Sequence, residues 1–124
     1  SPADLPPALA DRGQIRIVLD NLVRNALDAM PSGGRLGLVA RRDGDALEVS
    51  VTDTGDGISP ADLPRVTEPL FSTKARGLGL GLALSRMILD RNRGDLRVAS
   101  EPGRGSTFTV RLAAATTPEG VPYR

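Results

Sequence analysis

The chain of 124 residues contains no cysteine and no histidine. Without cysteine it can form neither a disulfide framework nor a thiolate metal site, which is typical of proteins in a reducing compartment. Without histidine it can hold no Ser-His or Cys-His nucleophile, no imidazole metal site and no phosphorylatable imidazole. Any catalytic histidine must therefore come from outside this chain.

Long apolar runs and a strong net charge are also missing. The apolar stretches fall far short of the roughly 20 residues that span a bilayer, and the N-terminal residues show no basic region followed by an apolar run. Sixteen basic and 15 acidic side chains leave a net charge of +1, so the total charge gives no reason to expect nucleic acid or an acidic membrane surface as a partner. We expect a cytoplasmic protein without direct membrane insertion.

The length is typical of one domain with a single core. We expect an extended, proline-containing leading segment over 1–10, the folded domain over 11–113 and a flexible tail over 114–124. Apolar spacing within the domain predicts helices over about 11–30, 59–66 and 80–93, and strands over about 36–40, 47–52, 96–100 and 107–112.

Helices interleaved with hairpin strands predict an α+β fold, a two-layer sandwich with a mixed, mostly antiparallel sheet covered on one face by about three helices. The first hairpin, with Asp43-Gly44 at its turn, is expected to bury one face. Asp11 and Gln14 resemble a capping box at the start of the first helix.

A polar row borders the apolar face of the first predicted helix. Asn21, Asn25 and Asp28 share one side of the helix at about 100° per residue. The asparagines could simply bond neighbouring backbone groups. Alternatively, Mg²⁺ keeps several waters and accepts one or two protein oxygens together with substrate phosphates, and an amide carbonyl is such an oxygen. On this second interpretation, Asn25 is the magnesium ligand.

Asp53 follows the second predicted strand and is itself followed by Gly55 and Gly57. Glycine backbone allows a flat ligand to approach without interference from Cβ atoms. A carboxylate accepts a hydrogen bond from the exocyclic amine of adenine, whereas the keto oxygen of guanine would repel it. A turn without any ligand is the alternative, because this short pattern is weak evidence by itself.

Residues 77–82 alternate glycine and leucine and open the last predicted helix. Backbone N–H groups at a helix start can hold phosphate. This is not a Walker loop, because the lysine and the Ser or Thr that should follow the last glycine are missing, and no strand directly precedes it. Lys74, the only lysine among sixteen basic residues, could reach a terminal phosphate if its loop folds over the site. A surface lysine in an arginine-preferring chain is the alternative.

The order and spacing of these motifs resemble the histidine kinase and gyrase-type ATP-binding superfamily, most closely the sensor histidine kinases. The short lid and the sequences NALDAMPSGG and EPLFSTK are most similar to the nitrogen-regulation and dicarboxylate-sensor branch. Thr67 and Leu78 depart from the family's usual phenylalanine and threonine, which puts lid packing in doubt. The matching motifs are an N-box at 21–29, glycine boxes at 53–58, 77–82 and 103–108, and an F-box at 68–74.

The resemblance implies a Bergerat-type fold with ATP and Mg²⁺ as cofactors. Asn25 would hold magnesium, Asp53 would bind adenine, and Ser106 would lie near adenine, through water. The other positions that the resemblance implies for ATP contact are Asn21, Asp28, Gly55, Gly57, Ile58, Lys74, Gly77, Leu78, Gly79, Leu80 and Gly81.

The implied activity is that of a protein histidine kinase. The domain would donate the γ-phosphoryl group of ATP to a histidine on a separate dimerisation domain of the same full-length protein, and a response regulator would receive it next. The chain would then be the cytoplasmic part of a sensor, with or without a membrane anchor, and would have no nucleic-acid partner.

Three further functions are compatible with this fold. The first is ATP hydrolysis, as in the gyrase-type ATPases. These enzymes carry a glutamate at the position of Asn21, and because an amide cannot act as a general base, the sequence favours phosphoryl transfer over hydrolysis. The second is a serine or threonine kinase of the anti-sigma type, and the third is an ATP-sensing docking module without transfer. A histidine-bearing helix upstream of Ser1 would favour the histidine kinase.

Overall fold

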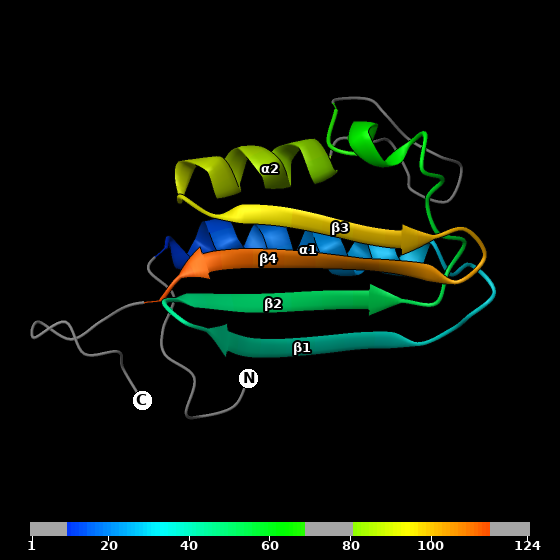
Figure 1. The fold of residues 1–124 in the computed structure, drawn as a ribbon, viewed down its shortest axis with the longest axis horizontal. Helices are drawn as coiled ribbons and strands as arrows, with labels where there is room; N and C mark the ends of the chain where they lie inside the picture. Colours follow the sequence, from blue (N-terminus) through cyan, green and yellow to red (C-terminus); the bar gives the residue numbers. More distant parts are fainter. Residues whose placement is uncertain (1–9, 69–80, 115–124) are drawn as a thin grey trace, which may run out of the picture.

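The computed structural model describes residues 10–68 and 81–114 and shows a four-stranded sheet with two α-helices on one face (Figure 1). The strands lie in the order β1-β2-β4-β3, and each of these pairings is antiparallel. The predicted α+β two-layer fold is confirmed. In chain order the elements are α1 (Arg12–Asp28), β1 (Leu36–Asp43), β2 (Ala46–Asp53), the 3₁₀ turn η1 (Leu63–Arg65), α2 (Gly81–Arg91), β3 (Asp95–Glu101) and β4 (Gly105–Ala113).

Two details of the predicted architecture need correction within the described residues. The sheet there has no parallel pair of strands, and segment 59–66 forms turns and η1 instead of a third α-helix. The side chain of Ser59 does accept a hydrogen bond from the Asp62 N–H at 3.3 Å, as expected of a helix cap. However, Pro64 has no N–H to continue the α-helical pattern, so the helix does not propagate.

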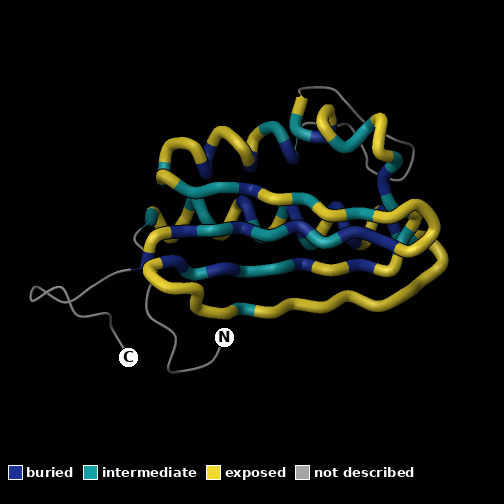
Figure 2. The backbone as a smooth tube through the Cα atoms, in the orientation of Figure 1, coloured by how far each residue is buried: buried dark blue, intermediate teal, exposed yellow. Residues whose placement is uncertain are grey.

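The core lies between the inward face of the sheet and the two helices (Figure 2). Alternation along β2 and β4 turns Val51 and Phe108 inward, while helical spacing does the same for Val18 and Leu22, and all four are fully buried. Burying one large apolar side chain contributes about 1.5–3 kcal/mol, so this cluster is the main stabilising feature. Its buried members are Val18, Leu22, Ala26, Val51, Ile58, Val66, Leu82, Ile88, Leu89, Leu96, Phe108, Val110 and Leu112.

Strand β1 does not bury one face as expected. Leu36 and Leu38, which face the same side of the sheet as Val51, are 38% and 60% exposed. β1 is an edge strand, and the helices contact β2 and β3 (Figures 1 and 2). Alternation therefore identified the strand correctly, but its burial depends on where the helices lie.

Only half of the expected capping box forms at the N-terminus of α1. Asp11 accepts a hydrogen bond from the Gln14 N–H at 2.9 Å, as expected. The other two groups of the box, the Asp11 N–H and the Gln14 side chain, bond to Asn92 at the end of α2 instead. Asn92 Oδ1 accepts a hydrogen bond from the Asp11 N–H at 2.9 Å, and its Nδ2 donates one to Gln14 Oε1 at 2.8 Å. Asn92 also donates to the Ile88 carbonyl at 2.8 Å. One amide side chain thus joins the start of α1 to the end of α2.

Helix α1 ends at Asp28, slightly earlier than the expected boundary near residue 30. At the other end of the chain, Ala114 was expected to begin a loose tail. It is buried instead, and its N–H donates to the Asp45 carbonyl at 2.8 Å. The remainder of the expected leading segment and tail, residues 1–9 and 115–124, lies outside the described residues.

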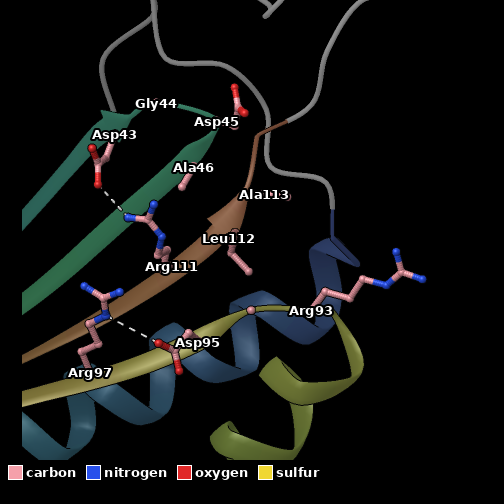
Figure 3. A pocket seen from close by; sticks show the side chains of 11 residues that line it. Asp43, Gly44, Asp45, Ala46, Arg93, Asp95, Arg97, Arg111, Leu112 and Ala113 are labelled. Carbon is pink, nitrogen blue, oxygen red and sulfur yellow. Dashed lines mark hydrogen bonds and ion pairs between the residues drawn. The ribbon is translucent and has the colours of Figure 1, made fainter. Parts of the chain in front are cut away.

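A charged cluster joins three strands on the outward face of the sheet. Glu48 is only 4% exposed and accepts hydrogen bonds from Arg41 on β1 and Arg111 on β4, each at 2.7 Å. Arg111 also binds Asp43 at 2.8 Å (Figure 3). The hydrogen bond from Arg111 is the main reason why the pKa values of both Glu48 and Asp43 lie below their ordinary range.

We expect Asn92→Ala to lower the free energy of unfolding by about 2 kcal/mol, because the change removes three hydrogen bonds and leaves their partners at the α1–α2 junction unsatisfied. Urea denaturation at pH 7 measures this. The neighbouring exposed residue provides the control: Arg91→Ala should change stability by no more than about 0.5 kcal/mol. Equal effects of the two substitutions would contradict the proposed role of the amide.

The lowered pKa of Glu48 predicts an acid-sensitive fold. Its ordinary value is 4.5, so the stability that it contributes is present above that pH and is lost as the pH falls through the lower pKa of the folded state. Urea midpoints measured between pH 7 and pH 3 should fall less steeply for Glu48→Gln than for the unmodified chain. Glu101→Gln, which changes an exposed carboxylate, should retain the original slope; identical slopes for all three proteins would show that Glu48 does not contribute.

Candidate functional site

The polar row on α1 faces the beginning of α2. Asn21 Nδ2 lies 3.3 Å from the Gly81 carbonyl and 3.4 Å from Ser85 Oγ. Ser85 is fully buried although it is polar, and sequence patterns did not single it out. Its position, three residues from both Leu82 and Ile88 on the core-facing side of α2, was the available signal. Asn21 therefore holds the first turn of α2 against α1.

Asn25, one helical turn after Asn21, has an unusual environment. The residue is 7% exposed, and its Nδ2 is buried without a hydrogen-bond partner among the described residues. An unsatisfied buried amide is costly, about 1–3 kcal/mol, and calls for a functional explanation. Asp28, the third member of the row, is exposed. The structure thus distinguishes Asn25 from the other two residues of the row.

Asp53 is the last residue of β2 and is 2% exposed. Its Oδ1 accepts a hydrogen bond from the Gly55 N–H at 2.9 Å, which fixes one carboxylate oxygen. In the antiparallel register, Ser106 of β4 lies directly opposite Asp53. Both residues occupy inward positions at the end of the sheet, beyond the apolar core. A buried carboxylate and a hydroxyl are thereby placed side by side.

Ser106 in turn contacts Ser100 on β3, a residue that sequence patterns did not reveal. Their hydroxyl oxygens are 2.7 Å apart. Ser100 Oγ also accepts a hydrogen bond from the Ile58 N–H at 2.7 Å. Ile58, which was expected to contact the ligand, is 1% exposed and belongs to the core. Its backbone N–H contacts Ser106 only indirectly, through Ser100.

The glycines after Asp53 allow the backbone itself to pack closely. A Cβ atom at Gly55 would overlap the Ala29 carbonyl, and one at Gly57, whose φ is 75°, would overlap the Glu101 carbonyl. The Asp56 N–H donates to the Ala29 carbonyl at 3.3 Å. We expected these glycines to leave room for a flat ligand. The described structure shows them leaving room for the end of α1 and the end of β3.

The C-terminal half of α1, the end of β2 and the beginning of α2 thus meet at one end of the sheet. A hollow of about 480 Å³ at this end is lined by residues that include Asp53, Ser100 and Ser106, and it opens partly onto the outward face at Thr52 and Thr107. Five expected ligand positions lie outside the described residues: Lys74, Gly77, Leu78, Gly79 and Leu80.

A larger hollow, of about 610 Å³, lies at the opposite end of the sheet (Figure 3). Its charged side chains are largely paired with one another: Arg111 binds Asp43, and Arg97 lies 3.5 Å from Asp95. It contains none of the residues of the predicted site. Within 10–68 and 81–114, no group of three or more acidic side chains is arranged to hold a metal ion.

The family profile described as "Histidine kinase-, DNA gyrase B-, and HSP90-like ATPase" matches residues 10–116. The chain belongs to this family. It is 41% identical over 113 residues to the sensor histidine kinase ZraS of Escherichia coli K12, an alignment that covers 91% of this chain and 24% of the relative. It is also 41% identical over 110 residues to the signal transduction histidine-protein kinase AtoS of the same strain, with 88% and 18% covered.

Solved structures agree with this membership. The catalytic domain of histidine kinase ThkA has a TM-score of 0.75 at 31% identity, covering 85% of this chain and 70% of that one. Full-length ShkA in complex with AMPPNP has a TM-score of 0.76 at 34% identity, covering 93% and 25%. This chain is the catalytic ATP-binding domain of a sensor histidine kinase. It spans about a quarter or less of the curated relatives named above, and its described helices are all too short or too polar to cross a membrane.

The close packing around Gly57 predicts a large stability loss on substitution. Gly57→Ala should cost about 1–3 kcal/mol more than Gly103→Ala. Both glycines have positive φ, 75° and 79°, but a Cβ at Gly103 would meet nothing within 4 Å. Gly103→Ala therefore isolates the cost of the left-handed backbone, about 1–2 kcal/mol. Urea denaturation of both variants tests this; equal losses would mean that the contact with the Glu101 carbonyl is not limiting.

Proposed function

We propose that this domain binds Mg-ATP at the end of the sheet bordered by Asn25 and Asp53, and donates the γ-phosphoryl group to a histidine outside the chain. The observation that carries the proposal is the buried amide of Asn25, whose Nδ2 lacks a partner among the described residues. The same end of the sheet holds the buried carboxylate of Asp53. One amide and one carboxylate suit the two ends of a nucleotide, its metal-bound phosphates and its amine-bearing base.

Asn25 suits the magnesium end. An amide side chain offers both a carbonyl oxygen, a ligand that Mg²⁺ accepts, and an N–H₂ group that can donate to a phosphate oxygen. Mg²⁺ takes few protein ligands and several waters or phosphates, so a site with one amide oxygen and no acidic cluster among the described residues fits it. Magnesium, when bound, would neutralise charge on the phosphates. Asn25 would bind and orient this end of the nucleotide.

Asp53 suits the base. One of its carboxylate oxygens accepts from the Gly55 N–H, and a carboxylate has room for further donors. The exocyclic amine of adenine is such a donor, whereas the corresponding keto group of guanine would face the carboxylate with an acceptor. Asp53 would therefore select adenine.

Phosphoryl transfer is favoured over hydrolysis by the surroundings of Asn21. Its Nδ2 is directed to Gly81 and Ser85, so this residue joins two helices, and an amide is not a general base for water. Transfer relies mainly on positioning and charge neutralisation, and the chain contains no histidine to accept the phosphoryl group. The acceptor would lie on a histidine-bearing dimerisation domain of the full-length protein, with a response regulator as the next partner.

Two finer assignments belong to the same proposal. The sequences NALDAMPSGG and EPLFSTK support a place near the nitrogen-regulation and dicarboxylate-sensor branch. Because ATP is the donor, we place the domain in the cytoplasm. The competing functions would share the nucleotide site: an anti-sigma-type serine or threonine kinase would differ in the acceptor, and a docking module would transfer no phosphoryl group.

Calorimetric titration with non-hydrolysable ATP and GTP analogues, with and without magnesium, tests the nucleotide site. We expect binding that prefers adenine and strengthens with magnesium. Asn25→Ala should abolish the dependence on magnesium. Asp53→Asn should weaken binding of the ATP analogue by about tenfold or more, as expected for loss of a hydrogen bond to a charged group. It should also reduce the preference for the ATP analogue over the GTP analogue.

Matched controls separate local chemistry from general damage. Leu27→Ala changes an exposed residue of α1, and Asp56→Asn changes an exposed carboxylate three residues after Asp53; both should bind like the unmodified domain. Unchanged binding by Asn25→Ala and Asp53→Asn would refute the site. Incubation of the domain with ATP and a separate histidine-bearing domain then distinguishes transfer from binding alone.

A further inference from the structure

Ser100 has a hydroxyl with several hydrogen-bond contacts near the proposed base site. It lies on β3 opposite Ser106 of β4. Its Oγ is 2.7 Å from the Ile58 nitrogen, 3.0 Å from the Gly105 carbonyl oxygen and 2.7 Å from Ser106 Oγ. It therefore has three close polar neighbours and only one proton to donate.

Counting protons leaves two arrangements for this group. The Ile58 N–H always donates to Ser100. In the first arrangement Ser100 donates to the Gly105 carbonyl, and Ser106 donates to Ser100, so that Ser106 presents only lone pairs to its other neighbours. In the second, Ser100 donates to Ser106, whose own proton is then directed elsewhere. Whether Ser106 donates to Ser100 or accepts from it is therefore linked to the direction of the Ser100 proton.

This choice matters because Ser106 lies opposite Asp53 in the β2–β4 register, and both are almost fully buried. A base bound next to Asp53 would meet the Ser106 hydroxyl, directly or through water, in a site shielded from bulk solvent. Adenine and guanine differ in the pattern of donors and acceptors along this edge. The direction of the Ser106 proton would therefore contribute to their discrimination.

We propose that Ser100 is a positioning residue of the purine site, which acts through Ser106 by setting the direction of its hydroxyl proton. This proposal rests on the proposed nucleotide function and deepens it. A purely structural role, in which Ser100 only holds the Ile58 N–H and the loop after Asp53, is the competing explanation. The two roles differ in one measurable respect: only positioning makes the effect of Ser100 depend on the presence of Ser106.

A double-mutant cycle with Ser100→Ala and Ser106→Ala measures this dependence. Binding of the non-hydrolysable ATP analogue with magnesium is titrated for the unmodified domain, both single variants and the double variant. We expect each single variant to bind about three- to tenfold more weakly, the effect of one neutral hydrogen bond. The double variant should bind no more weakly than the weaker single variant, because both changes remove the same contact. The preference over the GTP analogue should fall in all three variants.

The outward face of the same sheet supplies a matched control. Ser50 and Thr109 form an equivalent hydroxyl pair, 3.0 Å apart, on the face away from the helices. Ser50→Ala removes one member of that pair and should leave the affinity unchanged.

A second pair of variants guards against loss of folding. Ser100→Thr and Ser100→Val introduce side chains of the same shape, and only the threonine has a hydroxyl. When Ser106 is present, we expect the Ser100→Thr variant to bind the ATP analogue more tightly than the Ser100→Val variant. When Ser106→Ala is added to each, the two should bind equally.

The outcomes separate this proposal from the proposed function. If the unmodified domain binds no nucleotide, both fail. If it binds, but the effects of Ser100→Ala and Ser106→Ala multiply in the double variant, or if Ser100→Ala has no effect, the positioning role is refuted while the nucleotide site stands.

Discussion

The pairing register of β2 with β4 determines where the polar residues of the site lie. The register places Val51 opposite Phe108 within the core and, two residues further along, Asp53 opposite Ser106 at the sheet end. Because side chains alternate between the two faces of a strand, a slip of one residue would turn both pairs outward. The apolar pairs resist such a slip, since it would expose them to water. Core packing and site geometry therefore depend on the same hydrogen-bond ladder.

The helices are joined to one another by amide side chains at both ends. Near the sheet end that holds Asp53, Asn21 contacts the first turn of α2. At the other end, Asn92 connects the last turn of α2 with Asp11 and Gln14 of α1. Apolar contacts hold the helices together but permit sliding, whereas hydrogen bonds at two ends define their relative position. Asn25, one turn beyond Asn21 on α1, is thereby held at a constant place relative to the sheet.

Local patterns predicted most of the elements but not their surroundings. Alternation identified β1 as a strand, yet Leu38 is 60% exposed because the helices lie over other strands. The pattern of Asp11 and Gln14 predicted a helix start, yet half of the expected reciprocal bonding is made by Asn92, some eighty positions away. In each case the missing information was the identity of a spatial neighbour. Similarity of motifs supplied that information for Asn25 and Asp53, which the structure places at one end of the sheet.

The sequence by itself determined the α+β class, the order of the two α-helices and four strands, the absence of an internal phosphoacceptor histidine and membership of the ATP-binding family. The first three properties follow from composition and periodicity along the chain, and family membership follows from the resemblance of its short motifs to those of the histidine kinases. Tertiary structure alone decided that Ser100 meets Ser106 and Ile58, that Glu48 is buried between Arg41 and Arg111, and that the Asn25 amide lacks a partner among the described residues. The physical reason is that hydrogen bonds and ion pairs form between atoms about 3 Å apart, and only strand register and helix packing bring residues distant in sequence that close together.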